Sequence, residues 1–268
     1  MSKRYLTQIF PQLLPIRKKQ RQLCFYTAMR FDRNRYTDSQ RAEMLPYQLF
    51  ASSCPMYNTQ TGFDMVYQEN KVFNLKLASK PINGMLIRPG ETFSFCWAIR
   101  HADRDTPYKE GLTEVYGKLT TERGGGLCML SNLLFWLFLH TPLTIVERHG
   151  HQKKDFPEPP SDAPLGVDAT VTAGWLDLKV RNDTENTFQI CIAFDETNIH
   201  GEIRSDTVGL SYEVFNGPVS YCRENGQIFE EVDVCRQTPD GKKVTLYQNR
   251  CQIGYPLPEH TPIIEEDR

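Results

Sequence analysis

The longest apolar run in the chain lies at residues 127–146, which contain no Asp, Glu, Lys or Arg. Twenty such residues are long enough to span a bilayer as a helix. However, Ser131 and Asn132 stand near one end of the run, and Pro142 disfavours helix at the residue before it. We therefore predict a buried helix of about 13 residues, because a helix that is apolar nearly all round belongs in a protein core. A strand is predicted to follow it at 143–146.

Helical spacing also marks the N-terminal part of the chain. Residues 16–31 predict a helix, because side chains of one kind recur at helical intervals. The stripe contains Ile16, Leu23, Thr27 and Phe31.

Alternating positions predict strands in much of the remaining chain, bounded by turn sequences. The predicted strands are 72–77, 85–87, 169–172, 175–180 and 188–194, with turns at Asn83-Gly84, Asn225-Gly226 and Pro239-Asp240-Gly241. Within 175–180 the alternation turns Asp177 to solvent. The result is an α+β protein with a mostly helical N-terminal part, a mixed centre and a β-rich C-terminal third.

Composition narrows the class of partner. The 268 residues allow one large domain or two small ones, and the net charge of −2 is not that of a protein that coats nucleic acid. Residues 1–41 nevertheless carry ten basic and two acidic side chains. This arm could meet anionic lipid as a peripheral membrane contact, dock on the acidic remainder of the chain, or be a solvated helix face. We favour the last two interpretations, because a charge patch alone specifies little.

Whether the cysteines are thiols or disulfides depends on the compartment in which the protein lies. No apolar segment of signal-peptide length follows the basic residues at the start, so we expect a cytoplasmic protein, with the inner membrane surface as one location. In that compartment the eight cysteines are expected to be thiols. None forms a C-x-x-C pair, which argues against a zinc ribbon or a thioredoxin motif. We expect no cofactor.

The segment with the clearest chemical potential is Gly124-Gly125-Gly126-Leu127-Cys128. Three consecutive glycines permit positive φ and close backbone approach at the point where the buried helix begins. Cys128 falls in the first turn, where free N–H groups and the helix dipole favour a thiolate. The same N–H groups suit an oxyanion formed when a carbonyl is attacked. We expect Gly124, Gly125 and Gly126 to contact substrate.

A thiol nucleophile needs a base and a group that orients the base. Two histidines, His149 and His151, follow the strand predicted after the helix, and Asp168 enters the next predicted strand. His149 and His151 share a face if that segment is extended, so either is a candidate base. Arg148 could clamp a substrate carboxylate, although pairing with Glu147 or Asp155 is the simpler expectation.

Several ordered blocks of the sequence resemble the VanW family. They are Asn83-Gly84, Pro89-Gly90-Glu91-Thr92-Phe93-Ser94-Phe95, Gly124 to Ser131, Glu147-Arg148 with His151, and Gly166 with Asp168-Ala169-Thr170-Val171. The resemblance covers roughly residues 70–195. It implies a link to glycopeptide resistance, with a peptidoglycan precursor or another peptide-like molecule as substrate, but it supplies no reaction. Cys128, Ser131, His151 and Asp168 match the family pattern, which favours His151 as the base and leaves His149 and Ser131 as substrate contacts.

The same resemblance implies an organisation. The family order of cysteine helix, histidine strand and aspartate strand is similar to that of papain-like and transglutaminase-like cores, an analogy of fold only. We expect a basic, mostly helical region at 1–70, a VanW-like core domain at 71–205, and a β-hairpin-rich region with a loose tail at 206–268. Met129 departs from the family, which has Gln after the cysteine.

Two further interpretations stay open. Cys128, His149, His151 and Asp168 contain the ligand types of a zinc site, although no second cysteine stands near the first. The same pocket could also bind a precursor or a protein partner without catalysis, and Met129 is the feature that favours this alternative.

Overall fold

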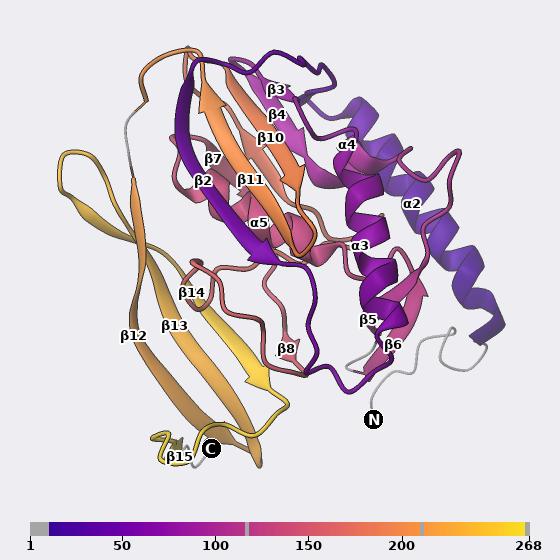
Figure 1. Ribbon diagram of the computed structural model, residues 1–268, viewed down its shortest axis with the longest axis vertical. Helices are drawn as coiled ribbons and strands as arrows, with labels where there is room; N and C mark the ends of the chain where they lie inside the picture. The colour runs from indigo at the N-terminus through magenta and orange to yellow at the C-terminus, as the bar shows by residue number, and fades with distance from the viewer. Residues whose placement is uncertain (1–10, 116–117, 210–211, 266–268) are drawn as a thin grey trace.

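The computed structural model describes residues 11–115, 118–209 and 212–265, and it confirms an α+β fold (Figure 1). The helices are η1 (Pro11–Leu13), α2 (Leu14–Phe31), α3 (Val66–Ser79), α4 (Phe95–Ile99) and α5 (Cys128–Leu139). The strands before α5 are β1 (Arg35–Tyr36), β2 (Tyr47–Pro55), β3 (Leu86–Ile87), β4 (Glu91–Ser94), β5 (Glu110–Val115) and β6 (Lys118–Arg123). Those after it are β7 (Thr144–Glu147), β8 (Lys153–Lys154), β9 (Lys179–Arg181), β10 (Phe188–Phe194), β11 (Asn198–Ser205), β12 (Glu213–Glu224), β13 (Gln227–Gln237), β14 (Lys243–Ile253) and β15 (Ile264–Glu265).

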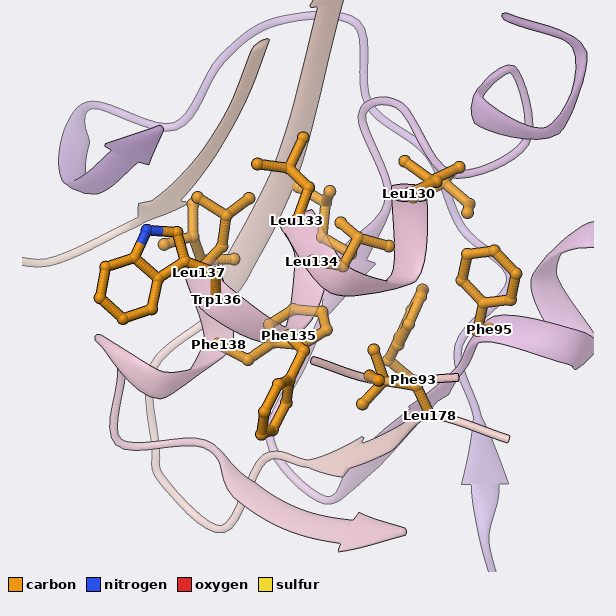
Figure 2. Packing of buried hydrophobic residues seen from close by; sticks show 14 of the residues in the cluster. Phe93, Phe95, Leu130, Leu133, Leu134, Phe135, Trp136, Leu137, Phe138 and Leu178 are labelled. Carbon is orange, nitrogen blue, oxygen red and sulfur yellow. The ribbon is translucent and has the colours of Figure 1, made fainter. Parts of the chain in front are cut away.

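Helix α5 forms the centre of the hydrophobic core, as its apolar sequence predicts. Nine of its residues are buried, from Leu130 to Leu139 (Figure 2). On one side the helix meets β11 closely at Gly201, where an added Cβ would lie 2.9 Å from the Leu137 side chain. On the other side the rings of Phe138 and Phe93 on β4 are 5.3 Å apart. The helix therefore lies between two sheets, which fixes where its N-terminus can point.

The two sheets beside α5 draw strands from distant parts of the chain. One has the order β2-β11-β10-β3 with antiparallel pairing throughout. The other has the order β1-β4-β9-β7. Strands β1 and β2 come from the first 70 residues, so the region expected to be a separate helical part also contributes two strands to the sheets of the core.

The remaining β structure is a C-terminal sheet in the order β15-β12-β13-β14-β8. Its hairpins turn at Asn225-Gly226 and at Gly241, all with positive φ, as their sequences predict. The short strand β8 pairs with the end of β14. Only one residue separates His151 from β8, so this pairing brings the C-terminal sheet next to the candidate site.

The structure corrects five local predictions. Residues 169–172 form no strand, and of 175–180 only the last two residues lie in a strand, β9. The cause is a turn at Gly174, with φ +78°, which folds the chain back so that Thr172 bridges Leu176. Residues 72–77 are helical, within α3, instead of forming a strand. Asn83-Gly84 therefore closes no hairpin, and Gly84 turns the chain with φ +79° against the backbone of Arg41. Asp177 is fully buried instead of facing solvent, and it accepts hydrogen bonds from Ser94 Oγ at 2.6 Å and Cys96 N at 2.9 Å.

Two outcomes concern the cysteines and the membrane. All eight cysteines lie in the described residues, and each is a free thiol. Among the described residues, no helix combines the length and the apolarity needed to cross a bilayer.

Candidate active site

Cys128 is the first residue of α5, and the three glycines before it shape the approach. Gly124 and Gly126 have φ of +80° and +87°, which glycine adopts without strain. Gly125 packs against the backbone of Gly111 on β5 so closely that any Cβ would collide with the Gly111 carbonyl. The turn is thus built from glycine for two separate reasons, and it sets the sulfur at the helix N-terminus.

The turn also decides which N–H groups are free. Gly124 and Gly125 donate to Lys109 O at 3.0 Å and Glu122 O at 3.1 Å, so their N–H groups are engaged in the hairpin. In the part of the chain that the structure describes, the N–H groups of residues 126–128 have no acceptor. Orphan N–H groups at a helix start carry partial positive charge. They are the donors that an oxyanion beside Cys128 would meet.

The thiol of Cys128 is set up to ionise easily. Its Sγ lies 3.4 Å from Thr170 Oγ1 and 3.8 Å from the Val171 carbonyl oxygen. Burial alone would raise the pKa of this thiol, but the hydrogen bond and the positive charge of His151 outweigh burial and lower the pKa below its ordinary value of 9.0. Thr170 lowers the pKa further. The sulfur is therefore more acidic than a free cysteine.

His151 is held by Asp168 through two atoms. The carboxylate Oδ2 of Asp168 lies 2.7 Å from His151 Nδ1 and accepts from the His151 backbone N at 2.9 Å. Burial works against the charged imidazole, but Asp168 and Cys128 raise the pKa of His151 well above its ordinary 6.5. With Nδ1 bonded to the carboxylate, Nε2 is the ring nitrogen that remains for the thiol.

Asp168 is in turn fixed by Arg148. Arg148 Nε donates to the Asp168 carbonyl oxygen at 2.6 Å, and its Nη2 donates to the Asp168 carboxylate. The same Nη2 lies 3.2 Å from Gly166 O and 3.0 Å from Asn249 Oδ1. The guanidinium also lies over the ring of Tyr247, 4.4 Å from its centroid. Arg148 was expected to clamp substrate or to pair with Glu147 or Asp155. In the structure its N–H groups donate to Asp168, Gly166 and Asn249.

Two other candidate contacts, His149 and Ser131, make their hydrogen bonds to groups other than the Cys128 thiol. His149 Nε2 lies 3.0 Å from Glu147 Oε1, and Glu147 also pairs with Lys179. Ser131 is fully buried, with Oγ 2.5 Å from the Ala169 carbonyl oxygen. Asn132 accepts from Ala169 N at 2.8 Å, so residues 131 and 132 fasten α5 to the segment that follows Asp168.

The structure brings Cys128, His151 and Asp168 together and adds residues that the sequence did not point to. Thr170 contacts the sulfur, and Asn249 and Tyr247 support Arg148. Thr170 belongs to the same motif block as Asp168, so its place in the block was a usable signal. Asn249 and Tyr247 stand on β14 with no motif around them.

The zinc alternative finds no geometric support. Among the described residues, no three His, Cys, Asp or Glu side chains are arranged to hold a metal ion. A cavity of about 940 Å³ lies over β2, β10 and β11, and none of its lining residues belongs to the Cys128 cluster.

These features define an α+β protein with a Cys–His–Asp cluster at a helix N-terminus. The family model described as VanW like protein matches residues 70–204, and the chain belongs to the VanW family. It is similar to the vancomycin B-type resistance protein VanW of Enterococcus faecalis, with 54% identity over all of both chains. It also matches YoaR, an uncharacterised protein of Bacillus subtilis, with 33% identity over 42% of this chain and 36% of the relative. No solved structure matches the chain.

Proposed function

We propose that this protein is an accessory protein of vancomycin resistance that acts on a peptidoglycan precursor or a similar peptide through Cys128. The resistance role rests on the full-length similarity to the Enterococcus faecalis protein of that name. The chemistry rests on one observation, the position of the Cys128 thiol at a helix start beside the His151–Asp168 pair, which lowers the pKa of the thiol. A cytoplasmic site of action is part of the proposal.

The reaction begins with transfer of the Cys128 proton to His151 Nε2. The thiolate then attacks a substrate carbonyl carbon, an S–C bond forms, and the carbonyl electrons move onto oxygen. N–H groups of residues 126–128 stabilise this oxyanion. As the oxyanion collapses, the C–N bond breaks and the leaving amine takes the proton from His151. Water or a second amine then gives a proton to His151 and attacks the thioester carbonyl. The S–C bond breaks, the Cys128 sulfur leaves and takes back that proton, and the product is a carboxylic acid (hydrolysis) or a new amide (acyl transfer).

Asp168 and Arg148 act on His151 without touching substrate. The carboxylate fixes the imidazole orientation and stabilises its charged form during proton transfer. Arg148 keeps that carboxylate ionised and prevents it from rotating, because it binds both the side chain and the carbonyl of Asp168. Both are positioning residues.

A second candidate function is binding of a precursor or partner without catalysis. Met129 favours it, because this apolar side chain packs against the core and offers no donor next to the thiol where the family has Gln. Under this alternative Cys128 need not ionise readily.

Alkylation of Cys128 separates the two. The folded protein is treated with iodoacetamide across a pH range, and modification at each cysteine is followed by peptide mass spectrometry. The proposal expects an apparent pKa for Cys128 below the ordinary thiol value of 9.0 in the wild type and a higher value in His151→Ala. Cys54 provides an internal control, because burial raises the pKa of its thiol to about 11.

Cys128→Ala should also remove the contribution of the protein to vancomycin resistance in cells. Binding without catalysis would instead leave resistance intact in Cys128→Ala. A Cys128 that stays unmodified until the protein unfolds would overturn the proposed chemistry.

A further inference from the structure

Helix α2 presents an unusual pattern, because its apolar stripe faces solvent. The stripe follows Ile16, Gln20, Leu23, Thr27 and Phe31 at intervals of three and four residues, which keeps it on one face of the helix. Ile16 is 64% exposed, Leu23 70% and Phe31 84%. Soluble helices normally turn such a stripe to the core.

The opposite face of α2 is attached to the fold through both polar and apolar side chains. Lys18 pairs with Glu122 on β6 at 2.5 Å. Tyr26 donates to the Cys96 carbonyl oxygen at 3.2 Å, and Met29 is buried. These contacts hold the inner face in place, so the fold sets the outward direction of the stripe. Figure 1 shows α2 along the outside of the molecule.

Basic side chains border the stripe. Residues 11–35 contain seven Lys or Arg and one acidic residue, Asp32. Lys19 precedes Leu23 by one turn, and Arg30 adjoins Phe31; both side chains are exposed. Trp175, 60% exposed, stands beside the helix under Arg21, whose guanidinium lies 5.0 Å from the ring centroid. Exposed apolar side chains next to cations and an aromatic are the groups through which a helix contacts a membrane interface.

We propose that α2 docks the protein on an anionic phospholipid surface. Ile16, Leu23 and Phe31 enter the boundary between headgroups and acyl chains, and Lys19 and Arg30 meet lipid phosphates. The basic residues beside the stripe favour an anionic bilayer over a second copy of the chain as the partner of this face. A second copy docking through the same face would bring two basic borders together, because a two-fold interface pairs each surface with itself. An anionic bilayer complements both the apolar stripe and the cations.

The test is flotation of the full chain with vesicles of phosphatidylglycerol and phosphatidylcholine in equal parts, and with phosphatidylcholine alone. Binding is expected to the anionic vesicles and to be weaker on the neutral ones. Leu23→Gln with Phe31→Gln should reduce vesicle affinity by about a hundredfold, because each buried side chain of this size is worth roughly tenfold in binding. Lys19→Gln with Arg30→Gln should weaken binding and reduce its salt dependence.

The matched control is Met44→Gln with Val208→Gln, which changes two exposed apolar residues, 58% and 77% accessible, elsewhere on the molecule. Its vesicle affinity should equal that of the wild type. The proposal is overturned if the wild type binds neither vesicle, or if the α2 variant binds as tightly as the control while its circular dichroism shows an intact fold. It is also overturned if light scattering shows a wild-type dimer that the α2 variant dissociates.

Discussion

Arg148 and Asn249 meet behind the candidate active site, with Nη2 and Oδ1 3.0 Å apart although 101 residues separate them in the chain. Asn249 is 4% exposed and stands on β14, outside the residues that match the family model. Its partner Arg148 binds Asp168, and Asp168 binds His151. The C-terminal sheet therefore supports the imidazole through a chain of three contacts.

Asn249→Leu should slow alkylation of Cys128 at neutral pH and lower stability. The substitution removes one of the three acceptors around Arg148 Nη2, and loss of a hydrogen bond to a charged group costs about 1.5–3 kcal/mol in the free energy of unfolding. A looser Arg148 holds Asp168 less firmly, so the apparent pKa of Cys128 should rise. Urea unfolding and the iodoacetamide pH profile measure the two effects.

Tyr247→Phe is the matched control on the same strand. It removes only the hydroxyl that donates to Gly166 O at 3.1 Å and keeps the ring under the guanidinium. We expect a loss of stability of about 1 kcal/mol with the Cys128 profile unchanged. If Asn249→Leu loses stability but retains the wild-type profile, the sheet has no influence on the imidazole.

The His151–Asp168 pair should make folding stability depend on pH in both directions. Burial opposes its ionisation, but His151 and Arg148 lower the pKa of Asp168 below its ordinary 3.8. This contribution is present above about pH 4 and is lost as the pH falls through the lowered value. Burial likewise opposes the imidazolium, but Asp168 and Cys128 raise the pKa of His151 well above 6.5. That contribution is complete below about pH 6.5 and is lost as the pH rises through the raised value.

The stabilisation by the pair should therefore be largest between about pH 4 and 6.5. The measurement is the free energy of urea unfolding of the wild type minus that of His151→Gln, taken across the pH range. A difference that stays constant with pH would show that the pair is not ionised as described.

The site was predictable from the sequence to the extent that local motifs carry it. Cys128, His151 and Asp168 stand in separate motif blocks. The triple glycine predicts a turn that needs positive φ. The support from Asn249 has no such signal, because an Asn on an alternating strand is equally suited to a solvated edge. Only the pairing of β8 with β14 brings it to Arg148.

The fold shows the same division between local and distant causes. The apolar run of α5 predicted its helix, because no other placement buries it. Residues 72–77 fit both alternating and helical spacing. Distant contacts favour the helix, because the side-chain amide of Asn74 in α3 donates to Lys109 O and accepts from Lys109 N. Asp177 is buried because it accepts the N–H of Cys96 at the start of α4, a role that alternation cannot reveal.

Ser131 provides a test of whether a family-matching residue contacts substrate or holds the fold. Its hydroxyl is buried and 2.5 Å from the Ala169 carbonyl oxygen. Ser131→Ala should lower the free energy of unfolding by about 1–2 kcal/mol and leave the alkylation profile of Cys128 unchanged. A large change in Cys128 reactivity with wild-type stability would assign Ser131 to the site instead.

The glycine turn before Cys128 gives a prediction with a built-in comparison. At Gly124 an added methyl makes ordinary contacts with the Tyr108 ring at 3.4 Å and the Leu127 side chain at 3.8 Å. The cost of Gly124→Ala is therefore mainly that of its positive φ, about 1–2 kcal/mol. At Gly125 the methyl would run into the backbone carbonyl of Gly111, which cannot move without separating the β5–β6 hairpin from the turn. Gly125→Ala should therefore lose more stability than Gly124→Ala, by at least about 1–3 kcal/mol for overpacking. Urea unfolding of the two variants measures this order, and equal losses would mean that the turn can shift away from β5 and that the position of the sulfur is set by α5 alone.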